Sequence, residues 1–210
     1  MKLVVLIVVC GWLAGCATTS VQDAPAAPQA APAAPQQAQP SGNMLVLSLG
    51  GRGLDESQWS PVEDQVSFGF EFVHEPIDSL IGFEVGTQFG FSGERINVPP
   101  TGDADVISTV SELYGGAHKT FFRDATTQPY IGGGVTLLYA LFATDFGNVT
   151  TSDEDSTAGL YVHGGVQTHV AKNFVIGLDL RAVFGTDITL FGSSGDADYG
   201  QVAFFLGIGF

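Results

Sequence analysis

The sequence predicts an all-β fold, an eight-stranded antiparallel up-and-down β-barrel that crosses a membrane with its strands. Beyond Asn43, apolar and polar residues alternate with a period of two, which is typical of strands with two unlike faces. Clusters of turn-forming residues divide this region into eight runs. The connections alternate between short and long, as in barrels with short turns at one end and longer loops at the other.

The first four runs cover residues 44–53, 65–74, 80–91 and 106–121. The third alternates most clearly. One of its faces carries Ile81, Phe83, Val85, Phe89 and Phe91, and the other carries Gly82, Glu84, Gly86, Gln88 and Gly90. Because successive side chains of a strand point to opposite faces, such a run has one apolar face and one polar face.

The last four runs cover residues 130–143, 158–171, 174–184 and a final strand that ends at Phe210. The final strand places Val202, Phe204, Leu206, Ile208 and Phe210 on one face. An apolar face of this kind predicts contact with lipid, since the outward face of a membrane barrel is apolar. An even number of strands returns both ends to the same side, so the final strand is expected to close the barrel against residues 44–53.

Four longer connections, residues 54–64, 92–105, 144–157 and 185–197, are predicted as external loops, and they are acidic. Their acidic residues are Asp55, Glu56, Glu63, Asp64, Glu94, Asp103, Asp105, Asp145, Asp153, Glu154, Asp155, Asp187, Asp196 and Asp198. Two interpretations stay open. The acids form a solvated anionic rim, or they bind divalent cations weakly through oxygen ligands, although no loop has the spacing of a Ca²⁺-binding loop.

If the apolar faces point outward, charged residues point into the lumen. The predicted polar network of the lumen consists of Arg52, Glu71, Glu84, Glu112, Asp179 and Arg181, with His118, His163 and His169 nearby. Ions inside a narrow barrel need partners, so both arginines are expected to lie among carboxylates. A network that fills the lumen is one interpretation, and a narrow or proton-linked conduit is the other.

The sequence predicts no catalytic, cofactor-binding or metal-binding residues, and therefore no enzyme. His163 and His169 would lie about 20 Å apart on one strand, too far to share a metal ion. The run Gly132–Gly134 has no following helix or lysine, so it does not predict a phosphate site. A net charge of -15 argues against a nucleic-acid partner.

The first 15 residues read as an export signal, with Lys2 before an apolar run at residues 3–9. The segment Leu13-Ala14-Gly15-Cys16 resembles the lipobox of bacterial lipoproteins, which implies an acylated Cys16 and handling by the lipoprotein-sorting machinery. The alternative is an ordinary signal peptide with an incidental cysteine. Residues 16–42 are then the acylated cysteine and a disordered linker rich in Ala, Pro and Gln, and residues 43–210 are the barrel domain.

Residues 43–210 resemble the small eight-stranded outer-membrane barrels of the OmpA, OmpX and OmpW-like kind. The resemblance extends to Ile208 and Phe210, which match the C-terminal signal read by the barrel-assembly machinery, whereas Phe205 stands where that pattern often has Gly. It implies a protein of the Gram-negative outer membrane, in contact with its lipid, with a structural or surface-interaction role. The alternatives are a lipid-modifying membrane enzyme, a narrow conduit, or a soluble lipocalin-like barrel on a lipid tether.

Overall fold

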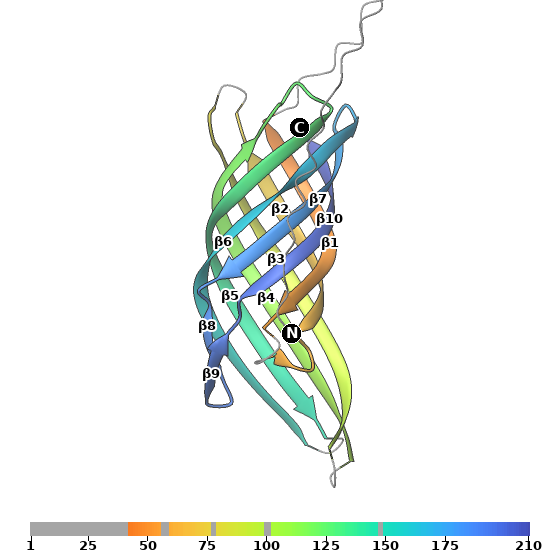
Figure 1. Ribbon diagram of the computed structural model, residues 1–210, viewed down its shortest axis with the longest axis vertical. Helices are drawn as coiled ribbons and strands as arrows, with labels where there is room; N and C mark the ends of the chain where they lie inside the picture. The colour runs from red at the N-terminus through yellow and green to blue at the C-terminus, as the bar shows by residue number, and fades with distance from the viewer. Residues whose placement is uncertain (1–41, 56–58, 77–78, 99–101, 147–148) are drawn as a thin grey trace, which may run out of the picture. The chain divides into compact units, whose positions relative to one another are not determined.

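The computed structural model describes residues 42–55, 59–76, 79–98, 102–146 and 149–210, which form a closed barrel of eight antiparallel strands (Figure 1). The barrel strands are β1 Asn43–Leu54, β2 Asp64–His74, β3 Gly82–Val98, β4 Gly102–Thr120, β5 Thr127–Asp145, β6 Thr150–Ala171, β7 Phe174–Phe184 and β10 Tyr199–Gly209. Two short strands, β8 Asp187–Leu190 and β9 Ser193–Asp196, form a separate hairpin. No helix in the described part of the chain is long and apolar enough to cross a membrane.

The first and last barrel strands close the sheet, as predicted. β1 and β10 are antiparallel and pair without a bulge from Met44 opposite Gly209 to Leu54 opposite Tyr199. Beyond the ladder, the Phe210 amide donates to the Asn43 carbonyl at 3.1 Å. The barrel therefore has no open edge along this seam.

The two faces of the sheet differ as the alternation predicts. Phe204 points outward and is 69% exposed, whereas its neighbour Phe205 points inward and is 6% exposed. The outward residues of the other strands are likewise exposed and apolar, and the buried inward residues include Arg52, Glu84, Glu112, His163 and Arg181. A lipocalin-like barrel needs the opposite arrangement, with apolar residues lining an internal cavity, so that alternative is excluded.

Phe205 fits inside the lumen because the facing strand carries a glycine there. It lies opposite Gly177 on β7, and a Cβ at Gly177 would collide with the Phe205 ring. The ring packs edge-on against Tyr130, with ring centroids 5.9 Å apart. The bulky residue that departs from the family pattern is thus a lumen-filling side chain.

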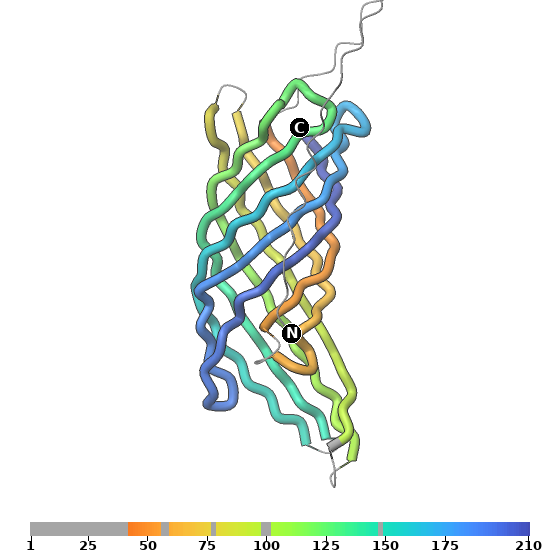
Figure 2. Tube along the Cα trace, in the orientation of Figure 1, coloured from red at the N-terminus to blue at the C-terminus, as the bar shows by residue number. Residues whose placement is uncertain are grey.

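Two of the predicted external loops are largely strand. β3, β4, β5 and β6 have 17, 19, 19 and 22 residues, against 11 for β2 and β7, so they extend through much of residues 92–105 and 144–157. Figure 2 shows these strands projecting at the end away from the C-terminus. The prediction was wrong because the projecting segments carry few apolar residues and most of their side chains are exposed, so alternation is too weak there to mark them as strands.

The predicted loop 185–197 also contains structure, the β8–β9 hairpin, which attaches to the projecting part of β6. Asp155 accepts the Thr189 amide at 2.6 Å, and Asp153 accepts the Phe191 amide at 2.5 Å. The Phe191 ring meets Phe142 edge-on at 6.0 Å. β6 pairs with β7 only from Leu160 onward, so the hairpin covers part of an edge that β7 leaves unpaired.

The loop end of the lumen is filled by an apolar cluster. Its buried members are Leu54, Trp59, Val110, Tyr114, Leu138, Ala140, Tyr161, Val183, Ile188, Ala197 and Tyr199. Trp59 is 1% exposed, and its indole N–H donates to the Asp196 carbonyl at 2.9 Å. The first long loop and the β8–β9 hairpin are thereby joined over the barrel mouth.

Candidate functional site

The polar lumen contains two connected groups of charged side chains, and the first is centred on Glu112 of β4. Its carboxylate pairs with Arg181 Nη1 at 3.0 Å and with Arg52 Nη2 at 3.7 Å. It also accepts hydrogen bonds from Thr136 Oγ1 at 2.9 Å and from the Tyr199 hydroxyl. Glu112 is 1% exposed, so two guanidinium groups share one fully buried carboxylate.

Aromatic rings complete the surroundings of both arginines. The Arg52 guanidinium lies 3.9 Å from the Tyr199 ring centroid and donates to Gln201, and Arg181 lies 3.9 Å from the Tyr114 ring centroid. Arg181 Nη2 also approaches Glu71 at 3.8 Å, and Glu71 accepts the Tyr114 hydroxyl at 2.7 Å. Each buried cation therefore has a carboxylate and the face of an aromatic ring as partners.

The second group is centred on Glu84 of β3, which lies between two histidines. One carboxylate oxygen lies 2.7 Å from His118 Nδ1, and the other lies 2.8 Å from His163 Nε2. On its other side, His163 Nδ1 is 2.9 Å from Asp179 Oδ1. All four side chains are buried, and Tyr161, which donates to Glu84, connects this group to the Arg181 group.

Strand register explains how the histidines meet. His118 on β4 and His163 on β6 both lie opposite Gly132 on β5, which has no side chain. A Cβ at Gly132 would collide with His163 Nε2 and the Glu84 carboxylate. The glycine therefore leaves the space in which rings from two non-adjacent strands reach one carboxylate.

This cluster was not predicted from the sequence, because spacing along one strand relates His163 to His169 and says nothing about His118 on another strand. His169, six residues beyond His163, lies nearer the turn end, where its Nε2 is 3.3 Å from Gln128 Oε1. The feature that could have indicated the cluster is Gly132 on a strand whose two neighbours each carry an inward histidine. It can be recognised only once the strand register is known.

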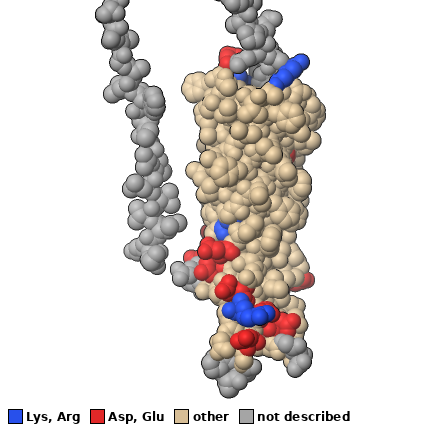
Figure 3. Space-filling view, turned by 90° about the vertical axis from the view of Figure 1, so that its right-hand side faces the viewer, with Lys and Arg blue, Asp and Glu red and all other residues tan. Residues whose placement is uncertain are grey.

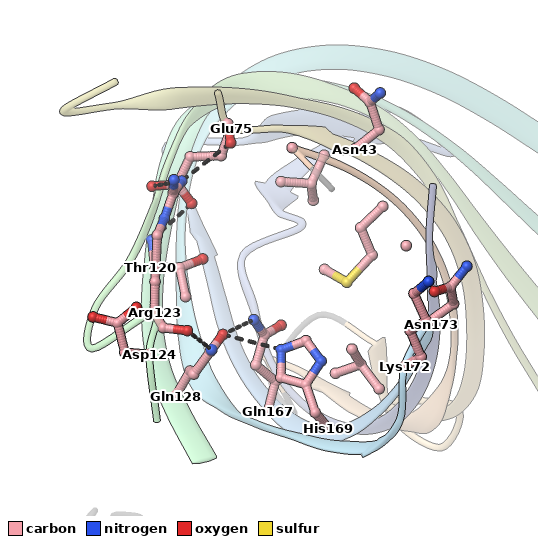
Figure 4. Close-up of a pocket in the computed structure, with 15 residues that line it drawn as sticks. Asn43, Glu75, Thr120, Arg123, Asp124, Gln128, Gln167, His169, Lys172 and Asn173 are labelled. Carbon is pink, nitrogen blue, oxygen red and sulfur yellow. Dashed lines mark hydrogen bonds and ion pairs between the residues drawn. The ribbon is translucent and has the colours of Figure 1, made fainter. Parts of the chain in front are cut away.

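A cavity of about 300 Å³ opens at the turn end of the lumen (Figure 4). Glu75 lies at its rim and pairs with Lys119 at 3.3 Å and with Arg123 at 2.6 Å. Deeper in, Gln167 Nε2 donates to Gln128 Oε1 at 3.0 Å.

A second, smaller cavity of about 20 Å³ lies beyond the turn-end cavity and is lined by His118, His163 and Asp179, among others. Met44 and Gln167 line both cavities, so the polar lumen is approached from the turn end.

The charges of the two lumen groups do not balance. Four carboxylates, those of Glu71, Glu84, Glu112 and Asp179, face two guanidinium groups, those of Arg52 and Arg181. The difference of two negative charges is balanced by protons on the carboxylates or on the buried histidines, or by another cation. In the described residues, Glu84, His118 and His163 are the group whose possible metal-binding atoms converge, all within 4.8 Å of one another.

The projecting end of the barrel is acidic and exposed. Figure 3 shows acidic side chains gathered there on one face, with a middle zone of that face nearly free of charged groups. Arg95 donates to Asp105 at 2.7 Å, and this hydrogen bond holds the pKa of the Asp105 carboxyl below its usual range. The acids at this end form no converging metal-binding group among the described residues.

The remaining predicted site residues lie apart from the lumen. Ile208 points outward opposite Leu45, and Phe210 is exposed beside Phe72, with ring centroids 6.5 Å apart. Cys16 and the linker lie outside the described residues.

A closed barrel of eight strands with an apolar outer face and a filled polar lumen has the fold of the small outer-membrane β-barrels. Three solved structures of that class are similar. Ail of Yersinia pestis, in complex with the heparin analogue sucrose octasulfate, gives a TM-score of 0.56 at 16% identity, covering 81% of this chain and 99% of Ail. Neisserial surface protein A gives 0.52 at 17% identity, covering 81% and 98%.

OprG of Pseudomonas aeruginosa gives a TM-score of 0.53 at 15% identity, covering 83% of this chain and 98% of OprG. Identities this low establish a common fold alone. No family model matches the chain, and no curated protein matches it.

Proposed function

We propose that this chain is an integral outer-membrane protein of a Gram-negative bacterium, with a structural or surface-interaction role. The observation that carries the proposal is the belt of exposed apolar side chains around a closed barrel whose polar residues face inward. The 11-residue strands β2 and β7 fit this position. At about 3.3 Å per residue and a tilt of about 40°, such a strand spans roughly 28 Å, close to the thickness of the hydrocarbon core.

The same position gives the two ends of the barrel different surroundings. The projecting strands β3–β6 and the β8–β9 hairpin lie outside the cell, and the short turns face the periplasm, because small outer-membrane barrels place their longer connections externally. The external end is acidic, so it favours partners that carry positive charge or anionic lipid bridged by divalent cations. Ail was solved with a polyanionic heparin analogue, and the acidic end of this chain does not suit such a ligand.

Membrane insertion is tested by heat-modifiability on a gel together with extraction of membranes at alkaline pH. The unboiled protein is expected to migrate differently from the boiled protein and to stay in the extracted membrane. Identical migration of the two samples, with release into the wash, would contradict insertion.

Orientation is tested with a single cysteine introduced at Glu94→Cys on the projecting part of β3, and with Asp124→Cys at the turn end as the matched control. Both positions are exposed. A maleimide that does not cross membranes is expected to label the first variant in intact cells and the second only after lysis. Labelling of the turn-end variant alone would reverse the orientation.

We further propose that Cys16 is acylated and that the protein is both lipid-anchored and integral. The lipobox-like segment 13–16 supports the anchor, and the terminal Ile208 and Phe210 support recognition by the barrel-assembly machinery. Radiolabelled palmitate is expected in the wild type and in Cys10→Ser, the control within the signal segment, but not in Cys16→Ser. Equal labelling of both variants would rule out Cys16 as the acylated residue.

The role is proposed to be non-enzymatic. All four histidines lie in the described residues. His74 is bonded to Asn43, His163 to Glu84 and Asp179, and His169 to Gln128. His118 lies between the Glu84 carboxylate and the Thr120 hydroxyl, but both His118 and Thr120 are buried in the lumen, away from a lipid substrate. Incubation of the purified protein with lipid A or phospholipid is expected to leave the lipid unchanged, and a released acyl chain would contradict this.

A further inference from the structure

We propose that the lumen binds one divalent transition-metal ion through His118 Nδ1, His163 Nε2 and the Glu84 carboxylate. Imidazole nitrogen together with carboxylate oxygen suits Zn²⁺ and its neighbours in the first transition row, and suits Mg²⁺ and Ca²⁺ poorly. The three side chains come from β4, β6 and β3, so strands that are distant along the chain supply the ligands.

The outer contacts of the ligands are those of a metal site. His163 has Asp179 behind its other ring nitrogen at 2.9 Å, and Asp179 in turn accepts the Tyr130 hydroxyl at 2.6 Å. His118 has Thr120 Oγ1 3.3 Å from its Nε2. Metal-binding histidines are usually held in this way, with the second ring nitrogen bonded to an oxygen that fixes the orientation of the ring.

The charge of the lumen also supports a bound cation at this site. With all four carboxylates ionised, pairing with the two guanidinium groups leaves two negative charges, which equal the charge of one divalent cation. A bound dication balances them while both rings are neutral, and neutral imidazole is the form that binds metals. The two arginines lie with Glu112 and Glu71, so the uncompensated charge lies on the side of Glu84 and Asp179.

The lumen also offers space for the metal ion and a route by which it can enter. The nitrogens lie 2.7 and 2.8 Å from the Glu84 oxygens, whereas two ligands of a tetrahedral zinc ion are about 3.3 Å apart. The ligands must therefore separate by about half an ångström on binding, and the 20 Å³ cavity beside both histidines provides room. The 300 Å³ turn-end cavity leads toward it past Gln167, whose buried Oε1 has no hydrogen-bond partner within the described residues.

The test uses the purified, folded chain without a histidine tag, in detergent, with Zn²⁺ alone as the probe. Equilibrium dialysis and elemental analysis are expected to show about one Zn²⁺ per wild-type chain and at least a tenfold loss of affinity in His118→Ala/His163→Ala. The matched control His74→Ala/His169→Ala removes the other two histidines and is expected to bind as the wild type does. Retained uptake in the first double variant would overturn the site and assign the zinc to the acidic end.

A second measurement needs no substitution, so it does not depend on whether a variant folds. Co²⁺ added to the wild-type protein is expected to give the intense visible absorption of four- or five-coordinate cobalt with nitrogen ligands. The weak spectrum of octahedral, oxygen-bound cobalt would overturn the proposal. Heat-modifiability of the same sample shows whether the barrel is folded, so failure of the metal site is distinguished from failure of the barrel assignment.

Discussion

At the scale of single residues, the buried ion pairs of this barrel contribute more to its stability than the exposed ones do. Glu112 is the carboxylate shared by Arg52 and Arg181, and all three side chains are at most 1% exposed. The Arg95–Asp105 pair has better geometry at 2.7 Å, but its side chains are 69% and 50% exposed. Burial, and not distance, decides what each pair contributes, because water screens the exposed pair.

The substitution Glu112→Ala is expected to lower the free energy of unfolding by about 3–5 kcal/mol, since it leaves two buried cations short of a counter-charge. The matched change Arg95→Ala at the exposed pair is expected to leave the free energy of unfolding nearly unchanged, because water and salt screen that pair. Urea unfolding of the barrel in lipid vesicles measures both. Equal losses in the two variants would show that the lumen pair is not the stronger one.

Gly132 has a similar importance for the histidine cluster. Gly132→Ala is expected to destabilise the barrel by about 1–3 kcal/mol, because the added Cβ collides with His163 and Glu84. Gly115→Ala on the adjacent strand is the control, since the nearest atom to its Cβ would be the Glu84 carbonyl oxygen at an ordinary 3.5 Å. Urea unfolding is again the measurement, and a Gly132→Ala variant as stable as the control would contradict the packing argument.

At the scale of elements, the β8–β9 hairpin depends on two carboxylates outside the apolar belt. The pKa of Asp155 is held below its usual range because the carboxylate accepts the backbone N–H of Thr189 and also that of Ser156. The stabilisation is therefore present at neutral pH and is lost as pH falls through this lowered pKa. The pKa of Asp196 shifts in the opposite direction, because burial and the nearby Asp198 and Asp187 raise it.

The hairpin is expected to detach below about pH 4, and Asp155→Asn is expected to remove most of this acid transition. Trp59, which donates to the Asp196 carbonyl, reports the change by fluorescence in a Trp12→Phe background, where it is the single tryptophan. Asp103→Asn, on the β3–β4 side, is the control and should keep the transition. An unchanged acid profile in Asp155→Asn would show that this carboxylate does not hold the hairpin.

At the scale of the whole molecule, the lumen is filled from the loop end inward. Trp59 and Val62 are 1% and 0% exposed near the mouth, and the Arg52, Glu112 and Arg181 side chains follow. The cavity at the turn end is open, and a cavity of about 20 Å³ lies beyond it among the described residues. Between this cavity and the loop end, the buried ion pairs and the apolar cluster fill the lumen.

Planar-bilayer recordings of the purified protein are expected to show no stable single-channel steps, because a continuous water path would require the buried ion pairs to separate. A known porin, added to the same bilayer afterwards, serves as the positive control. Stable and ion-selective steps from this protein would support the narrow-conduit alternative instead.

Residue order alone is enough to predict the strand number, the outward face of each strand and the closure of residues 44–53 by the last strand. These features depend on a period of two and on turn-forming residues, which are local. The same local signal failed at residues 92–105 and 144–157, where strands continue with few apolar residues and mostly exposed side chains, so the alternation is too weak to mark their register.

The arrangement within the lumen depends on which inward residues face one another across the barrel, and that follows from register and closure. Glu112 between two arginines, and Glu84 between histidines of β4 and β6, involve residues separated by between 34 and 79 positions. Alternation shows that these side chains point inward, but only the closed sheet determines their neighbours, because a shift of register would give each of them different partners.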